Sequence, residues 1–417
     1  MKAKAVRLYG ASDLRMEEFE LPKMGENEIL ARVVCDGVCM STHKAALQGT
    51  AHRRVPKDAG TNPVMIGHEF CGEIMEVGPK WKDRFKPGMR FVVQTALGID
   101  GSLDAPGYSY RWIGGDSTHI VIPNEVMEAK CLLPFEGKSF FRGALAEPVS
   151  CVVGAFHASY HAKYGSYAHD MGLKPGGKCA MLAAAGPMGS AAVEYALNFD
   201  RKPSLLVVTD VDPARLARAE ALNGPAKARA KGVDLRYVNT AGVADPVAAL
   251  RAIASEGFDD VFAFAPVREV VECADKIMGF DGCLNFFAGP TDKAFAATVN
   301  MYNIHYAFTH FVATSGGNKD DMAEGLVLMS QGVIDPGFLF THIGGLTAVA
   351  ETTLNLPKIA GWKKLIYTHA DMPLTAISDF ADRGKTDPFF ARLAELTPAG
   401  LWTAEAEQYL LANAKKV

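Results

Sequence analysis

The first 155 residues have the pattern of short, half-buried strands. Residues 28–35 alternate apolar and polar side chains, as a strand with one buried face does. Similar short apolar runs follow, and Pro and Gly often interrupt the chain between them. The pattern predicts further strands at residues 70–78, 90–94 and 119–122. We therefore expect the first part of the chain to be rich in β-structure.

Beyond residue 165 the pattern changes to apolar runs that alternate with helical periodicity. Helices are predicted to begin at Pro187 and Pro213. Strands are predicted at residues 178–183, 205–209, 259–264 and 283–288. This alternation is typical of βαβ units and a parallel sheet, which indicates an α/β protein. After residue 310 the pattern predicts a helix at 320–331, a strand at 364–367 and a polar helical tail.

The composition is that of an ordinary globular protein, with 417 residues, 49% hydrophobic and 22% charged. A formal net charge of −4 gives no basic excess for a nucleic-acid partner. The most apolar long stretch, residues 179–197, contains Glu194 and a Gly-Pro break, so we expect no membrane span. No apolar segment follows the first Met, and the eight cysteines form no C-x-x-C pair. We therefore expect a cytoplasmic protein with reduced, mostly buried thiols.

A candidate phosphate-binding turn lies between a predicted strand and a predicted helix, at residues 182–189. Gly186 lets backbone N–H groups approach a pyrophosphate, and Gly189 lets the helix pack on the sheet. Ala184 stands where the dinucleotide fingerprint has its first Gly, so an ordinary turn is the alternative. The residues expected to hold the cofactor here are Gly186, Pro187, Met188 and Gly189.

Asp210 ends the next predicted strand, about 20 residues after Gly189. A carboxylate at this distance can accept hydrogen bonds from a ribose diol, which favours NAD. Two alternatives stay open. An aspartate here could instead cap the next helix, a role that Asp212 could equally fill, and Arg215 could attract the 2′-phosphate of NADP. We expect NAD as cofactor, with Asp210 and Arg215 near the ribose.

A dispersed set of metal-binding residue types lies in the first part of the chain: Cys39, His68, Glu69 and Glu147. A catalytic zinc ion takes about three such ligands and keeps one position open. It polarises an alcohol or carbonyl oxygen. Taken singly, a Cys is more often a buried apolar residue and a Gly-His-Glu sequence a surface loop. The interpretation of these four residues as a metal site therefore depends on the motifs that surround them.

Six short motifs appear in order along the chain. They are Gly37-Val-Cys-Met-Ser-Thr-His43, Gly67-His68-Glu69, Lys86-Pro-Gly-Met-Arg90, Gly114-Gly-Asp-Ser-Thr-His-Ile120, Ala146-Glu147-Pro148 and Ala185-Gly-Pro-Met-Gly189. To about residue 370, the chain resembles the zinc-dependent medium-chain dehydrogenase/reductase family. Glu147-Pro148 stands where many alcohol dehydrogenases have Cys, which is similar to the polyol, sorbitol-type branch. The whole pattern looks most like the L-sorbose-1-phosphate reductases and related sugar-phosphate dehydrogenases.

The resemblance implies a GroES-like, partly closed β-barrel catalytic domain and a Rossmann coenzyme domain with a doubly wound parallel sheet. The catalytic domain would contain residues 1–155 and 311–417, ending in a helical tail. The coenzyme domain would contain residues 156–310, with the active site in the cleft between the two. Family members commonly form homodimers or homotetramers through a Rossmann sheet edge, near residues 284–312 here.

The resemblance also implies how the zinc would be bound. Cys39 and His68 would be ligands, with Glu69 and Glu147 as acidic partners, and which of the two acids binds the metal directly stays open. The segment 91–110, where the family has a four-cysteine lobe, contains no Cys. We therefore expect one catalytic zinc ion and no structural zinc.

Three side chains are candidates for proton transfer or other catalytic roles. By the resemblance, Ser41 lies where the family has a hydroxyl near the reacting oxygen, and Glu69 is the acid beside the zinc-binding His. The family pattern after the Cys is usually Gly-Ser-Asp-x-His, but here it is Met-Ser-Thr-His-Lys. Lys44 therefore replaces the usual relay His, with His43 beside it, and the exit route of the proton stays open.

The resemblance implies hydride transfer between a nicotinamide cofactor and a secondary alcohol or ketone of a sugar or sugar phosphate, of the sorbose-1-phosphate or glucitol-6-phosphate type. A phosphate group needs cations, and candidates are the basic loop 52–57, Lys44 and Arg111, although a solvated charged loop is the plainer interpretation. Three other functions stay open. They are dehydrogenation of a free polyol such as sorbitol or of a threonine-like secondary alcohol, zinc-free reduction of quinones or enals, and non-catalytic dinucleotide binding.

Overall fold

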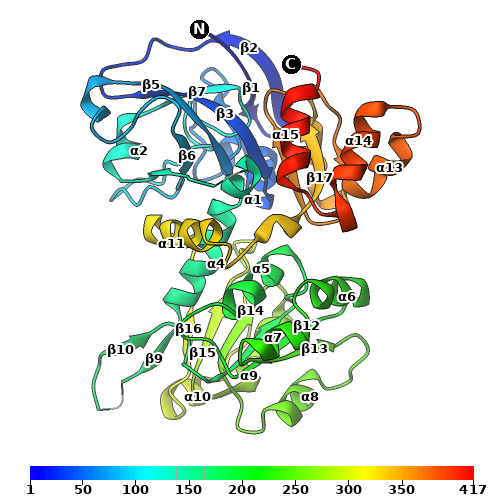
Figure 1. The fold of residues 1–417 in the computed structure, drawn as a ribbon. Coiled ribbons are helices and arrows are strands. Elements are labelled where there is room, and N and C mark those ends of the chain that lie inside the picture. Colours follow the sequence, from blue (N-terminus) through cyan, green and yellow to red (C-terminus); the bar gives the residue numbers. More distant parts are fainter. Residues whose placement is uncertain (138, 164) are drawn as a thin grey trace. The chain divides into compact units, whose positions relative to one another are not determined.

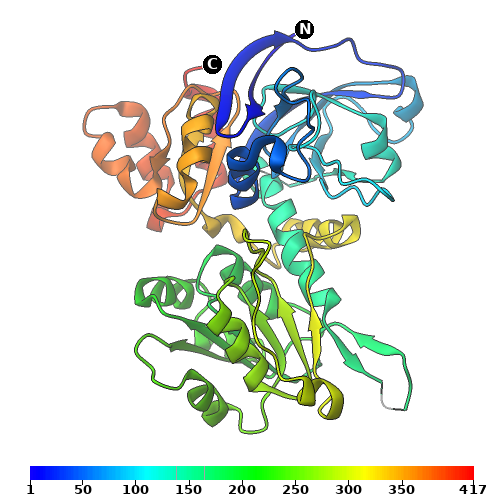
Figure 2. The ribbon, with the colours of Figure 1, turned by 180° about the vertical axis from the view of Figure 1, so that it is seen from behind.

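The computed structural model describes residues 1–137, 139–163 and 165–417, and its contacts divide the chain into two compact units. Unit 1 contains Met1–Ser150 and Asn318–Val417, and unit 2 contains Cys151–Gly317. Both ends of the chain therefore belong to unit 1 (Figures 1 and 2). The sequence analysis expects the corresponding boundaries after residues 155 and 310.

Unit 1 is built on an eight-stranded sheet, in which β7 pairs with β3 beside the path β19-β17-β18-β3-β5-β6-β8. A three-stranded sheet of order β2-β1-β4 accompanies it. The bounds of these strands are β1 Lys2–Gly10, β2 Asp13–Glu20, β3 Ile29–Val38, β4 Val64–Met65, β5 Phe70–Val77, β6 Arg90–Val93, β7 His119–Ile122, β8 Leu132–Pro134, β17 Phe340–Gly345, β18 Lys363–Tyr367 and β19 Thr375–Ala376.

Strand β3 joins the two ends of the chain. It pairs antiparallel with β5 and β7 from the first part and with β18 from the last part, where Lys364 lies opposite Val38. Apolar side chains of β3, β5 and β7 belong to a buried cluster that includes Ile29, Ile74 and Ile120. Since β3 ends at Val38 and β18 begins at Lys363, the residues at these two strand ends are brought together.

The helices of unit 1 are mostly short. Their bounds are α1 Met40–Gln48, α2 Asn124–Glu128, α3 Phe140–Ala144, α11 Lys319–Ser330, α12 Val349–Asn355, α13 Phe380–Arg383, α14 Pro388–Leu396 and α15 Ala404–Asn413, and α4 Ala146–Ala158 continues into unit 2. Among the described residues, none of the helices combines the length and the apolar character needed to cross a bilayer.

All eight cysteines are free thiols and five of them are buried, as the sequence predicts.

Unit 2 contains a six-stranded parallel sheet of order β13-β12-β11-β14-β15-β16 (Figure 1). This is the 3-2-1-4-5-6 order of a doubly wound Rossmann sheet. Its strands are β11 Lys178–Leu182, β12 Leu205–Asp210, β13 Asp234–Asn239, β14 Phe258–Ala263, β15 Met278–Phe286 and β16 His310–Val312. The other elements are the hairpin β9 Tyr160–Ala162 and β10 His169–Met171, and the helices α5 Pro187–Ala196, α6 Pro213–Leu222, α7 Pro225–Ala230, α8 Pro246–Ile253, α9 Arg268–Ile277 and α10 Met301–Tyr306.

Candidate metal centre and dinucleotide turn

Cys39 lies at the junction between β3 and α1 and has an extended backbone (φ −119°, ψ 149°). Its Sγ lies 3.1 Å from the hydroxyl of Ser41 in the first turn of α1. Burial and the charge of Glu69 raise the pKa of the Cys39 thiol to about 12, against the opposing effect of Lys363. The thiolate form at this position therefore needs a further positive charge, such as a bound cation.

His68 and Glu69 follow a turn that only glycine can make. Gly67 has φ +90°, and a Cβ there would lie 2.5 Å from a carboxylate oxygen of Asp36 and 2.6 Å from the amide of Asp116. The turn places Glu69 at the start of β5, where its backbone N–H donates to Asp36 Oδ1 over 2.9 Å. The glycine and the buried carboxylate of Asp36 together fix the position of this metal-binding candidate pair.

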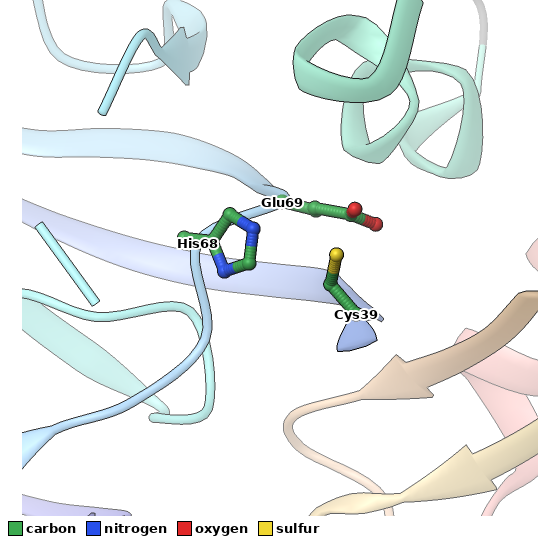
Figure 3. A group of neighbouring side chains, drawn as sticks. All are labelled: Cys39, His68 and Glu69. Atoms are coloured by element: carbon green, nitrogen blue, oxygen red, sulfur yellow. The ribbon is translucent and has the colours of Figure 1, made fainter. Parts of the chain in front are cut away.

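The side chains of Cys39, His68 and Glu69 converge on one point (Figure 3). One ligand atom from each lies within 4.8 Å of the others, and His68 and Glu69 are buried. Among the described residues, this is the one group of three or more His, Cys, Asp or Glu side chains with such spacing. The donor set of thiol, imidazole and carboxylate matches what zinc takes in proteins, so the residues present fit this metal.

His68 is held by hydrogen bonds at both ring nitrogens. Its Nδ1 lies 2.9 Å from the hydroxyl of Thr42, and its Nε2 lies 3.2 Å from the hydroxyl of Tyr108. Burial, with smaller effects of the cations Lys363 and Arg54, lowers the pKa of His68 to about 3. The imidazole is therefore neutral, which is the form that binds metals.

Glu69 forms a buried ion pair with Lys363 at the start of β18. The Lys363 ammonium donates to both carboxylate oxygens, over 2.6 Å to Oε1, and the two side chains are 8% and 2% exposed. Burial alone would lower the pKa of Lys363, but the charges of Glu69 and Cys39 raise it above its ordinary value. Sequence reasoning missed Lys363, because the residues around position 363 give no sign that this lysine pairs with Glu69.

Glu147 lies at the start of α4 and is not part of the three-residue group. Its charge nevertheless acts on that group, since it contributes to raising the pKa values of Cys39 and Tyr108, both of which are raised mainly by burial. Both acids named by the sequence analysis are therefore near the candidate centre, and Glu69 is the one whose oxygen lies within the ligand spacing.

Tyr108 is a second residue that sequence reasoning missed. It is fully buried, and its ring centroid lies 4.8 Å from that of His68. Burial raises the pKa of Tyr108, and the neighbouring hydroxyl of Ser41 opposes that rise. Ser41 therefore lies near Tyr108 as well as beside the Cys39 thiol. Two further candidates lie on α1 with Ser41. His43 is hydrogen-bonded through Nδ1 to the carbonyl oxygen of Thr353 at 2.8 Å, and Lys44 is half-buried.

A pair of buried carboxyl groups, Asp36 and Asp116, lies under the His68-Glu69 turn. Burial raises the pKa of Asp116 to about 7, and burial together with the charges of Asp116 and Glu69 raises that of Asp36 well above its ordinary value. Among the described residues, Asp36 Oδ2 and Asp116 Oδ1 are buried and have no hydrogen-bond partner. Because two adjacent buried carboxylates repel, one proton shared between them is the favoured state.

In unit 2, the glycine turn after β11 has two glycines with different environments. A Cβ at Gly189 would collide with the carbonyl oxygen of Ala184, so only glycine lets α5 approach the end of β11. A Cβ at Gly186 would meet nothing within 4 Å, and Gly186 is the N-cap of α5, where it makes no side-chain capping hydrogen bond. Pro187 and Met188 form the first turn of that helix. The turn therefore has the open N-terminus that a pyrophosphate binds.

The acid at the end of β12 serves the backbone in this structure. Asp210 Oδ1 accepts from the amides of Val211 and Asp212, and Oδ2 accepts from that of Ala185 at 3.1 Å. The cap of α6 is Asp212, which also pairs with Arg215 over 3.5 Å. Oδ2 of Asp210 accepts one bond and has capacity for another, so a ribose hydroxyl remains chemically compatible.

Comparison with known proteins agrees with this arrangement. The alcohol dehydrogenase GroES-like domain family matches residues 25–131. Mannitol-1-phosphate 5-dehydrogenase from Aliivibrio fischeri is 48% identical over 410 residues, covering 98% of this chain and 97% of the relative. L-sorbose 1-phosphate reductase from Klebsiella pneumoniae is 48% identical over 414 residues, covering 99% and 98%.

Among solved structures, the fold is similar to that of 2R,3R-butanediol dehydrogenase from Bacillus subtilis, with a TM-score of 0.72, 24% identity and coverage of 88% of this chain and 99% of that one. A GroES-like unit together with a doubly wound parallel sheet defines an oxidoreductase of the alcohol dehydrogenase type. The chain belongs to the zinc-dependent medium-chain dehydrogenase/reductase family, whose members act on CH–OH groups with NAD(P).

Proposed function

We propose that this protein is a zinc-dependent dehydrogenase that transfers a hydride between NAD and a secondary alcohol or ketone of a sugar phosphate, of the L-sorbose 1-phosphate or glucitol 6-phosphate type. The observation that carries this proposal is the buried group of Cys39, His68 and Glu69. Two near-full-length relatives at 48% identity, which are named for mannitol 1-phosphate and L-sorbose 1-phosphate, support the substrate class.

Cys39, His68 and Glu69 would bind a single zinc ion, with Glu147 as the neighbouring acid. The low pKa of His68 favours the neutral imidazole that binds metal, and the high pKa of the Cys39 thiol favours a site that gains a cation. Lys363 would neutralise Glu69 when the metal is absent. The segment 91–110 has no Cys, which supports one zinc ion per chain.

A bound zinc ion supplies Lewis acidity toward the reacting substrate oxygen. The protein's own part is to position the substrate and move a proton. Ser41 Oγ would accept the proton of the substrate hydroxyl, because it lies beside the Cys39 thiol, at 3.1 Å from Sγ. Lys44, at the position of the family's relay His, would pass the proton toward water.

The glycine turn of unit 2 would bind the pyrophosphate of the cofactor, through Gly186, Pro187 and Met188 at the start of α5. The open space at Gly186 supports this role, and the close packing at Gly189 supports the helix position that it needs. Asp210 would accept a hydrogen bond from the ribose, which favours NAD, and Arg215 would lie near the same ribose and allow some use of NADP.

The test is an assay after metal analysis. Purified protein should contain about one zinc per chain. It should also turn over at least one of two substrates, by reducing L-sorbose 1-phosphate with NADH or by oxidising mannitol 1-phosphate with NAD. Cys39→Ala should lose more than about 99% of kcat, since a missing ligand removes the metal. The control is Cys131→Ala, a buried thiol whose contacts are the backbone oxygens of Leu97 and Ala129. A metal-free protein that reduces quinones or enals but none of these sugars would contradict the proposal.

A further inference from the structure

Arg54 lies beside the candidate metal centre, separated from it by one aromatic side chain. Its guanidinium carbon is 5.3 Å from the ring centroid of Tyr108. On its other side Tyr108 contacts His68, with 4.8 Å between ring centroids and 3.2 Å between the hydroxyl and Nε2. The positive charge of Arg54 acts on both His68 and Tyr108. Burial lowers the pKa of His68, and Arg54 lowers it further. Burial raises the pKa of Tyr108, and Arg54 opposes that rise.

The loop holds Arg54 in a defined place. Its backbone N–H donates to Nδ1 of His52 at 3.3 Å, and its carbonyl oxygen accepts from the hydroxyl of Ser109 at 2.7 Å. The ring of His52 stacks on that of Tyr108, with centroids 5.9 Å apart and an angle of 14°. A cation that stands on an aromatic ring and is tied at both backbone atoms loses little further freedom when it binds a ligand.

The hydrogen-bonding capacity of Arg54 is not used up within the protein. Across the part of the chain that the structure describes, no carboxylate lies within ion-pair distance of this half-buried side chain. Its Nε is buried and has no hydrogen-bond partner. By contrast, the similarly half-buried Arg142 is paired with Asp335 over 2.7 Å. A partly buried guanidinium without an anion beside a catalytic centre indicates that the anion comes from outside.

We propose that Arg54 binds the phosphate group of the substrate and so distinguishes a sugar phosphate from the free sugar. This inference rests on the proposed function and names the residue that sets its substrate class. A planar guanidinium can give a phosphate two parallel charged hydrogen bonds, which a lysine cannot. No covalent step is involved.

Other cations near the centre are less suited to this role. The ammonium of Lys57 donates to the carbonyl oxygen of Thr50 over 2.5 Å, and that of Lys363 is neutralised by Glu69. Arg111 is exposed and lies over Trp112, with 5.0 Å to the ring centroid. Arg53, the neighbour of Arg54, is exposed.

The experiment compares zinc-loaded wild type with Arg54→Ala, Arg54→Lys and Arg53→Ala, assayed on L-sorbose 1-phosphate and L-sorbose. Arg54→Ala should lower kcat/KM for the phosphorylated sugar about 10- to 100-fold and change that for the free sugar by less than about twofold. Arg54→Lys should retain part of the preference because it keeps the charge but loses the fork. Arg84→Ala, which removes an arginine from the ring of Trp81, is the matched control and should change neither value.

Two further measurements keep the result interpretable. Zinc content and the melting temperature report whether each variant retains its metal centre and its fold. If Arg54→Ala loses either one, Arg54→Lys takes its place in the comparison. Calorimetric titration of the zinc-loaded protein with inorganic phosphate needs no turnover, so it tests Arg54 even if no sugar is a substrate and the proposed function fails. Phosphate binding weakened by about tenfold or more in Arg54→Ala supports the inference. An unchanged ratio of kcat/KM and unchanged phosphate binding, or an equal loss in Arg53→Ala, would overturn it.

Discussion

At the level of single residues, the charge of Glu69 in the candidate metal centre is balanced by a group from a distant part of the chain. The carboxylate of Glu69 is buried with the ammonium of Lys363, and the carboxyl pair of Asp36 and Asp116 lies beneath them. Removing one partner of a buried ion pair leaves a charge that neither water nor another group compensates. Lys363 therefore stabilises the buried carboxylate of Glu69, and a metal ion bound at this candidate site would compete with Lys363 for it.

We expect Lys363→Met to destabilise the metal-free protein by about 3–5 kcal/mol, because Glu69 remains buried without its counter-ion. The same variant should gain more stability from added Zn²⁺ than wild type, since the released carboxylate can bind it. Urea unfolding followed by tryptophan fluorescence measures both effects, because all four tryptophans lie in unit 1. The double variant Lys363→Met/Glu69→Gln should recover most of the loss. Equal losses in single and double variants would show that the ion pair is not the cause.

Sequence reasoning found the residues that local motifs mark and missed those that the fold supplies. Cys39, His68 and Glu69 each stand within two positions of a glycine, in short recognisable patterns. Lys363 is separated from Glu69 by 294 positions, and Tyr108 from His68 by 40. Such contacts depend on how β18 and the loop before β7 pack, which no local pattern encodes. The signal for Lys363 is its position within a strand of entirely buried residues, and burial is itself a product of the tertiary structure.

At the level of elements, the periodic pattern was most informative where local rules dominate. Strand β7 has the predicted bounds, and α5 and α6 begin at Pro187 and Pro213 as expected, because proline favours the first position of a helix. Strand β15 begins five residues earlier than predicted, with a register shift against β14 that apolar periodicity does not show. Helix α4 ends at Ala158, and His161 lies beyond it on β9, within ion-pair distance of Asp260 and Asp281.

The two glycines of the dinucleotide turn should separate stability from cofactor binding. Gly189→Ala should destabilise unit 2 by about 1–3 kcal/mol, since its Cβ meets the Ala184 carbonyl and the backbone must move. Gly186→Ala should change stability by less than about 1 kcal/mol, because nothing lies within 4 Å, but should weaken NADH binding. Scanning calorimetry and NADH fluorescence titration measure the two effects. Unchanged NADH binding in Gly186→Ala would remove this turn from the cofactor site.

At the level of the whole molecule, each unit has its own core. Buried clusters around Ile29 and Leu8 belong to unit 1, and the cluster around Val261 belongs to unit 2. The candidate metal ligands lie in the first unit and the glycine turn in the second. Unit 1 is formed from both chain ends through the pairing of β3 with β18, so the ion pair of Glu69 with Lys363 can form only after the last part of the chain has been added.

Removal of the metal should therefore abolish turnover and leave NADH binding intact. A metal that binds only the folded state stabilises it by about 2.7 kcal/mol at a concentration 100 times its Kd. Dialysis against a chelator should thus lower the melting temperature that tryptophan fluorescence reports for unit 1, and added Zn²⁺ should restore both stability and activity. Cys39→Ala should show the lower temperature from the start and no response to the chelator. Full turnover after removal of the metal would refute a catalytic zinc ion, and loss of NADH binding together with the metal would show that the two units do not bind independently.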